Sequence, residues 1–109
     1  MKTIYLNDAQ KKIVLEILTR HFPNQKYFIF GSRATGKKLK PFSDLDIAIQ
    51  STTRLNDPSL AKASEDFSAS DLPFKVDLVD LDSISPEFIS NIKSDLILLT
   101  ETTPTNPSR

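Results

Sequence analysis

YFIFGSRATG at residues 27–36 and SDLDIAI at residues 43–49 decide the fold of this chain. The aromatic and β-branched run that opens the first stretch is typical of a buried strand, and Gly31-Ser32 ends it. The second stretch alternates polar and apolar residues, which predicts a strand with one apolar face. A basic loop at 37–42 joins the two. We therefore expect a β-sheet that contains both stretches.

Further elements follow from periodicity and turn residues on either side. A helix is expected over residues 8–22, because apolar residues recur at helical spacing and Asn7 and Gln10 are placed to form a capping box. The remaining expected elements are a helix from Asp57-Pro58 to about Ser68, a strand over 74–81, a helix beginning at Ser85-Pro86 and a short strand over 96–99. This order predicts an α+β fold, a mixed β-sheet with helices packed on one face.

Length and composition describe one ordinary domain. The chain has 109 residues, of which 39% are hydrophobic and 26% are charged. We expect the domain to cover residues 1–101 and residues 102–109, with two prolines and no large apolar side chain, to form a disordered tail. No apolar run approaches the ~20 residues of a membrane span, and no signal-peptide pattern opens the chain. A cytoplasmic protein without a membrane partner is expected.

The absence of cysteine and the single histidine exclude thiolate chemistry and His-rich metal sites. His21 lies near a predicted helix end, where a cationic group is favourable, so we expect it to be non-catalytic. The net charge is zero, which argues against general nucleic-acid binding. Residues 1–43 nevertheless carry nine lysines and arginines against two acids, and residues 44–101 carry twelve acids against four. Such asymmetry fits a site where cations face phosphates and acids hold metal, although solvated charge is the simpler interpretation.

The turn after the first strand is a candidate phosphate site. Glycine lets the backbone approach a ligand closely, and a helical turn starting near Ser32 would direct free N–H groups at a phosphate. The Ser32 hydroxyl would add a donor. A Gly-Ser pair also occurs in ordinary turns, so this feature needs support from others.

Asp44 and Asp46 form a candidate metal site. Residues i and i+2 of a strand face the same side, while Leu45 and Ile47 face the core. Two carboxylates on one face repel each other, and a cation such as Mg²⁺, which takes oxygen ligands and shares substrate phosphates, would make them compatible. The alternative is that Asp44 belongs to a turn and Asp46 points to solvent.

Asp77 is the candidate third acid, because it lies inside the apolar run 76–79. It would complete the cluster if its strand pairs beside the Asp-x-Asp strand, and otherwise it would be a surface position. Alternation places Asp80 on the opposite face, so only one of the two can join from a regular strand. Asp80 and Asp82 lie nearer the strand end and are expected to be solvated. We therefore select Asp77.

The chain resembles the minimal nucleotidyltransferase (MNT) family of the DNA polymerase beta superfamily. The resemblance lies in a shared pattern: Gly-Ser, a spacer, Asp-x-Asp and a third acid on a later strand. The spacer from Arg33 to Ser43 has eleven residues, slightly more than the commonest form in that family. The resemblance covers about residues 8–100 and implies the polymerase-beta-like nucleotidyltransferase fold. It also implies a role for each motif. These roles are nucleotide binding at Gly31, Ser32 and Arg33, with Lys37 or Lys38 as a further cation, and catalysis and metal binding at Asp44, Asp46 and Asp77.

The implied reaction is a transfer that needs two Mg²⁺ ions and moves a nucleoside monophosphate, AMP from ATP, onto a hydroxyl. The chain resembles the antitoxins of HEPN/MNT pairs, whose acceptor is a tyrosine of a helical HEPN-type toxin. A hetero-oligomer with such a protein, encoded nearby, is therefore expected. We expect Leu39 and Phe42 on the basic loop to contact it.

Two alternatives remain open at this point. The chain could be a non-catalytic antitoxin, a binding module that neutralises its partner by contact. It could also be a nucleotidyltransferase for a small molecule, although a chain of this length leaves no room for a separate acceptor-binding domain.

Overall fold

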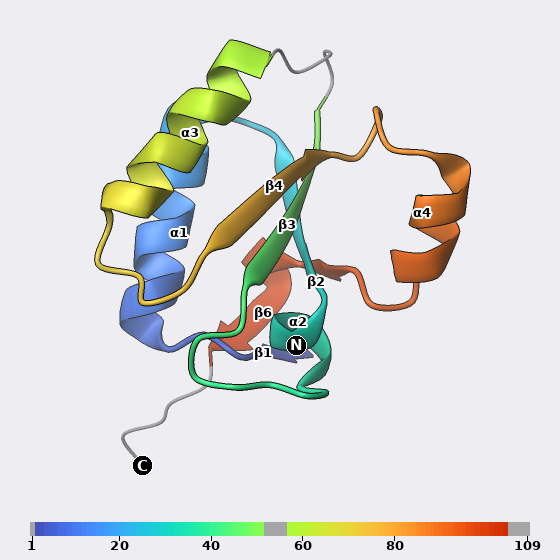
Figure 1. Ribbon diagram of the computed structural model, residues 1–109, viewed down its shortest axis with the longest axis horizontal. Coiled ribbons are helices and arrows are strands. Elements are labelled where there is room, and N and C mark those ends of the chain that lie inside the picture. Colours follow the sequence, from blue (N-terminus) through green and yellow to red (C-terminus); the bar gives the residue numbers. More distant parts are fainter. Residues whose placement is uncertain (1, 52–56, 105–109) are drawn as a thin grey trace.

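The computed structural model describes residues 2–51 and 57–104 (Figure 1). The helices are α1 (Asp8–His21), α2 (Ser32–Thr35), α3 (Asp57–Ala69) and α4 (Pro86–Ile92), with a 3₁₀ turn, η1, at Leu99–Glu101. The strands are β1 (Lys2–Ile4), β2 (Lys26–Phe30), β3 (Leu45–Gln50), β4 (Val76–Asp80), β5 (Ile97–Leu98) and β6 (Thr102–Pro104).

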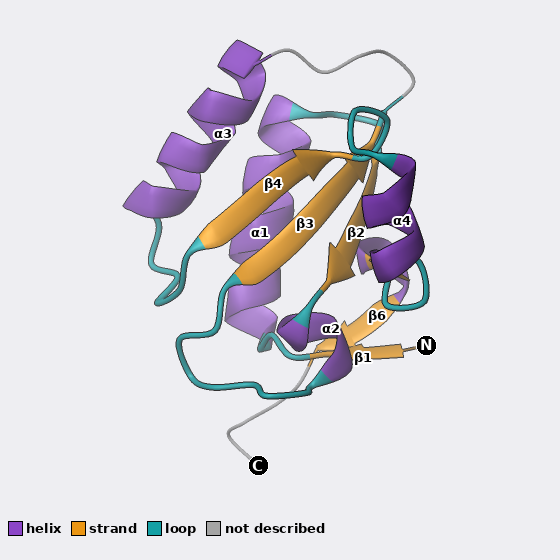
Figure 2. Ribbon diagram, turned by 45° about the vertical axis from the view of Figure 1, so that its right-hand side comes forward, coloured by secondary structure: helices purple, strands orange, loops and turns teal. Residues whose placement is uncertain are grey.

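The main sheet has the strand order β4-β3-β2-β5, and Figure 2 labels the first three of these strands side by side. β2 pairs antiparallel with β3 and with β5, whereas β3 pairs parallel with β4. A parallel pair needs a crossover connection, and α3 supplies it between β3 and β4. The predicted mixed sheet and α+β class are confirmed.

The two faces of the sheet bury different sets of side chains. Ile29, Ile47 and Ile49 belong to the main core, on the face that α1 and α3 cover (Figures 1 and 2). The alternate residues face the other way, where Phe30 and Ala48 form a smaller core with Ile92 of α4 and its neighbours. α4 therefore lies against the second face, which also carries the candidate acids. The prediction that the helices pack on one face is correct for α1 and α3 but not for α4, because Ile92 is buried against Phe30 and Ala48.

Capping residues lie at the predicted starts of α1 and α4. The Asn7 side chain accepts from the Gln10 N–H (2.8 Å), and the Asn7 N–H donates to Gln10 Oε1 (3.0 Å), which completes the capping box of α1. Ser85 Oγ accepts from the Phe88 N–H (3.2 Å) at the start of α4. Within the described ranges, no helix is long and apolar enough to cross a membrane.

A second, two-stranded sheet corrects the predicted domain boundary at residue 101. β6 (Thr102–Pro104) pairs parallel with β1 (Lys2–Ile4), so the tail does not begin at residue 102. Both strands are three residues long, and their pairing uses backbone groups that a reading of apolar periodicity does not detect. Residues 105–109, also assigned to the tail, lie outside the described residues.

Candidate active site

Strand pairing brings the predicted acids together at one end of the sheet. Asp46, the second residue of β3, is the register partner of Asp77, the second residue of β4. On its other side Asp46 pairs with Phe30, the last residue of β2. Asp44 immediately precedes β3. The condition on which Asp77 was selected, a β4 strand lying beside β3, is met.

Gly31 follows β2 at this same end and lies against Asp46. Its φ is +75°, in the region that favours glycine, and a Cβ atom built there would overlap Asp46 Oδ2. Gly31 is also the N-cap of α2, where its carbonyl accepts from the N–H groups of Ala34 and Thr35, both at 3.0 Å. The N–H groups of Ser32 and Arg33, in the first turn of α2, have no acceptor within the helix. The predicted phosphate turn therefore lies directly beside the carboxylates.

The electrostatics of the cluster favour a cation. Burial, followed by the negative charges of Asp77 and Asp44, raises the pKa of Asp46 to about 6. Lys75 Nζ lies 3.6 Å from Asp77 Oδ1, but both side chains are substantially exposed, so this ion pair offsets the repulsion only weakly.

Carboxylate oxygens are the ligands that Mg²⁺ prefers, so the donor set fits that ion. Among residues 2–51 and 57–104, however, no three His, Cys, Asp or Glu side chains are close enough to hold a metal by themselves. Mg²⁺ is commonly held by one or two carboxylates together with water and substrate phosphates, and the arrangement suits that mode of binding.

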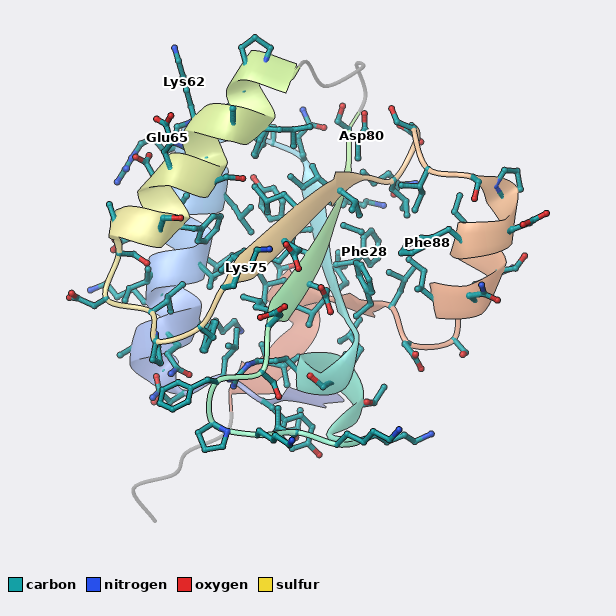
Figure 3. All side chains as sticks on the ribbon, viewed as in Figure 1. Phe28, Lys62, Glu65, Lys75, Asp80 and Phe88 are labelled. Carbon is teal, nitrogen blue, oxygen red and sulfur yellow. The ribbon has the colours of Figure 1, made fainter. Side chains whose placement is uncertain are left out.

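Asp80 differs from its expected state. It was predicted to be solvated, yet it is 6% exposed and accepts from the Asp82 N–H (3.0 Å) and the Ser83 hydroxyl (2.9 Å). These bonds stabilise the turn after β4, a common use of aspartate. Asp80 and Lys75 lie near opposite ends of β4 (Figure 3). Asp80 therefore has a structural role away from the acid cluster.

The Arg33 side chain is not placed to meet a phosphate. It is 6% exposed, and its guanidinium donates to the backbone carbonyls of Tyr5, Pro41 and Ser43. Sequence reasoning had no signal for these contacts, because they depend on the course of the 37–43 loop. Lys37 and Lys38, the other expected cations, are exposed on that loop.

His21 lies in the last turn of α1, as expected for a non-catalytic residue. Its Nε2 is 2.5 Å from Asp66 Oδ2 on α3, and Arg20 Nη1 reaches the same oxygen at 3.3 Å. The pKa of Asp66 is lowered, chiefly by the hydrogen bond from His21. This contact joins the two helices of the main core.

The sequence profile of the family described as polymerase beta, nucleotidyltransferase, matches residues 11–105. The chain belongs to this family. The nucleotidyltransferase is also similar to the probable protein adenylyltransferase MntA of Haemophilus influenzae, with 39% identity over 96 residues that cover 88% of this chain and 83% of the relative.

Solved structures agree on the nucleotidyltransferase fold. A toxin–antitoxin structure with AMP-PNP superposes with a TM-score of 0.69 at 24% identity, covering 82% of this chain and 71% of that chain. A second structure contains a tri-AMPylated HEPN toxin of Shewanella oneidensis in complex with an MNT antitoxin. It gives a TM-score of 0.64 at 22% identity and covers 82% of this chain and 67% of that chain. At these identities the likeness shows the fold.

Proposed function

We propose that this nucleotidyltransferase moves AMP from ATP onto a hydroxyl of a partner protein, a tyrosine of a HEPN-type toxin, and thereby acts in the cytoplasm as its antitoxin. One observation carries the proposal: Asp46 lies opposite Asp77 in the sheet and against Gly31 of the phosphate turn. The likeness to a probable protein adenylyltransferase supports the choice of AMP and of a protein acceptor.

The phosphate turn would hold the β- and γ-phosphates of ATP. Gly31 permits the close approach, and the N–H groups of Ser32 and Arg33, with the Ser32 hydroxyl, would donate to phosphate oxygens. Arg33 thus contributes through its backbone, since its guanidinium is bound elsewhere. Lys37 or Lys38 on the exposed loop would add positive charge.

The acids would hold the metal. Asp44 and Asp46 would bind two Mg²⁺ ions that they share with the triphosphate, and Asp77 would ligate the ion nearer the acceptor. Bound there, Mg²⁺ would neutralise the triphosphate and favour ionisation of the acceptor hydroxyl. Burial and the negative charges of Asp77 and Asp44 raise the pKa of Asp46 to about 6. A bound cation would therefore stabilise the ionised form of Asp46.

The transfer is a displacement at the α-phosphorus. The acceptor oxygen forms a bond to this phosphorus, the bond from the phosphorus to the α,β-bridging oxygen breaks, and pyrophosphate leaves with the electron pair. The hydroxyl proton passes to the Asp77 carboxylate, whose side chain is 44% exposed and can release the proton to water. Positioning and charge neutralisation supply most of the catalysis in reactions of this type.

The partner would approach over the basic loop at 37–42. Phe42 on this loop is 72% exposed, the most exposed of the large hydrophobic side chains in the described residues. The loop runs directly into Ser43 and Asp44, so a protein docked on Phe42 would reach the acid cluster. Aromatic side chains, Phe among them, are enriched in protein interfaces relative to the rest of the surface.

Calorimetric titration with α,β-methylene ATP, in which the bond to be broken is blocked, tests nucleotide and metal binding before any transfer. We expect Mg²⁺ to strengthen binding at least tenfold, because nucleotide and carboxylates share the ion. Glu65→Gln, on the exposed side of α3, should bind like the wild type. Binding indifferent to Mg²⁺ would contradict the metal site, and no binding at all would favour an antitoxin that acts by contact alone.

A further inference from the structure

Arg33 is buried, and each of the three guanidinium nitrogens donates a hydrogen bond to a backbone carbonyl. Nη1 donates to the Tyr5 carbonyl at 2.8 Å, Nη2 to the Pro41 carbonyl at 3.0 Å and Nε to the Ser43 carbonyl at 3.1 Å. The Phe74 ring covers one side of the guanidinium, with its centroid 4.0 Å from Cζ. Charged donors make strong hydrogen bonds, and a planar fork fixes the direction of each.

The bond to Ser43 is made to the peptide group directly before Asp44. The Ser43 carbonyl belongs to the peptide group that carries the Asp44 N–H, and Asp44 lies before the first residue of β3. On the far side, the Leu45 N–H donates to the Lys75 carbonyl at 2.8 Å. Asp44 is therefore held between an Arg33 bond on one side and the sheet on the other, while its own side chain is exposed.

The same residue belongs to the phosphate turn. Arg33 is the second residue of α2, and its carbonyl accepts from the Tyr5 N–H at 2.8 Å, so backbone and side chain both bind Tyr5. Its ring contact, Phe74, lies three residues before Asp77. Arg33 thus contacts the backbone just before Asp44, the ring three residues before Asp77, and the segment that holds the phosphate turn.

We infer that Arg33 is a positioning residue for the transfer reaction, which fixes the Asp44 peptide relative to the phosphate turn without contacting substrate through its side chain. The inference deepens the proposed function and rests on it for its catalytic part. Lysine could not replace arginine in this role, because a single ammonium nitrogen cannot span three carbonyls in fixed directions.

The test compares Arg33→Lys, which keeps the charge and the side-chain stem, with Arg20→Lys on the exposed face of α1 as control. Amide hydrogen exchange of residues 39–45 is measured on the proteins alone, and kcat and KM for ATP are measured with the partner protein. We expect exchange in Arg33→Lys to rise at least about tenfold because the loop is released. We expect kcat to fall about 100-fold from a displaced Asp44. KM for ATP should rise by a smaller factor, because Asp44 shares Mg²⁺ with the triphosphate, and both constants of Arg20→Lys should stay at the wild-type values.

A positioning role for Arg33 requires both the faster amide exchange and the lower kcat in Arg33→Lys. Unchanged exchange with a raised KM for ATP would instead identify the guanidinium as a phosphate ligand, and either change without the other would also overturn the positioning role. Arg33→Met, which removes every donor, should show the larger exchange, and if it does not fold Arg33→Lys still decides. A wild-type protein that transfers nothing would overturn the proposed function and the catalytic part of this inference, whereas the exchange comparison would still decide whether Arg33 fixes the Asp44 segment.

Discussion

The carboxylate of Asp46 occupies the space that a side chain on residue 31 would need, and Gly31 adopts a φ of +75° at that point. Two requirements, one steric and one conformational, therefore select glycine here.

Gly31→Ala should disable the site. The new methyl group would displace Asp46 and strain the backbone, at a cost of about 1–3 kcal/mol in stability, and Mg²⁺-dependent binding of α,β-methylene ATP should fall at least tenfold. Gly36→Ala is the matched control, because Gly36 has a φ of +77° but its added Cβ would meet Tyr5. Calorimetry on both variants that found equal nucleotide affinity would contradict the account of Gly31.

Asp77→Ala and Asp80→Ala should separate catalysis from stability. The first removes the acid opposite Asp46, so turnover should fall at least 100-fold while nucleotide still binds through Asp44 and Asp46. The second removes the acceptor of the Asp82 and Ser83 bonds, so the protein should lose about 1–2 kcal/mol of stability and keep its turnover. Steady-state kinetics and thermal unfolding measure the two effects, and an exchange of the two phenotypes would show that the β4 register is misassigned.

Asp46→Asn should stabilise the protein without metal at neutral pH. The pKa of Asp46 is about 6 in the folded state, above its unfolded value, so the folded protein loses stability as pH rises from about 4 to 6. Removing the charge should restore about 1 kcal/mol above pH 6, a value reduced for partial exposure to solvent. The gain should vanish below about pH 4, where Asp46 is protonated in both states. Thermal melts of both proteins from pH 3 to 8 check this, and a gain that persists at pH 3 would rule out the charge explanation.

Phe42→Ala should weaken the partner complex and nothing else. The side chain is 72% exposed, so the melting temperature should stay the same, since exposed positions rarely contribute more than 0.5 kcal/mol. Loss of an interface anchor of this kind costs on the order of 1–2 kcal/mol, which corresponds to roughly a tenfold rise in Kd. Surface plasmon resonance with the purified partner measures it, and an unchanged Kd would place the interface elsewhere.

Alternation along β3 predicted that Asp46 lies on the face opposite to Ile47 and Ile49. The caps at Asn7 and Ser85 predicted where α1 and α4 begin. The neighbour of β3 could not be obtained in this way, because period-two patterning defines the faces of a strand and not its pairing partner. Asp77 was therefore a conditional choice until the β3–β4 register was known.

Arg33 and Asp80 show the other limit of sequence reasoning. An arginine beside a Gly-Ser turn is ordinarily interpreted as a charge that faces a ligand. An acid at a strand end is ordinarily interpreted as a solvated charge. Their hydrogen bonds to the loop at 37–43 and to the turn after β4 arise only from the tertiary arrangement. Backbone contacts of this type leave no periodicity in the sequence, and the same holds for the β1–β6 pair.

We propose that this chain transfers AMP through Asp44, Asp46 and Asp77. The most direct measurement is the intact mass of the purified HEPN-type partner after incubation with ATP, Mg²⁺ and one of three proteins: wild type, Asp46→Asn or Glu65→Gln. We predict AMP adducts on a partner tyrosine with wild type and Glu65→Gln, and none with Asp46→Asn, because an amide is a much poorer ligand for Mg²⁺ than a carboxylate. Adducts formed equally by Asp46→Asn, or a partner neutralised by the wild-type protein with no adduct at all, would contradict the account.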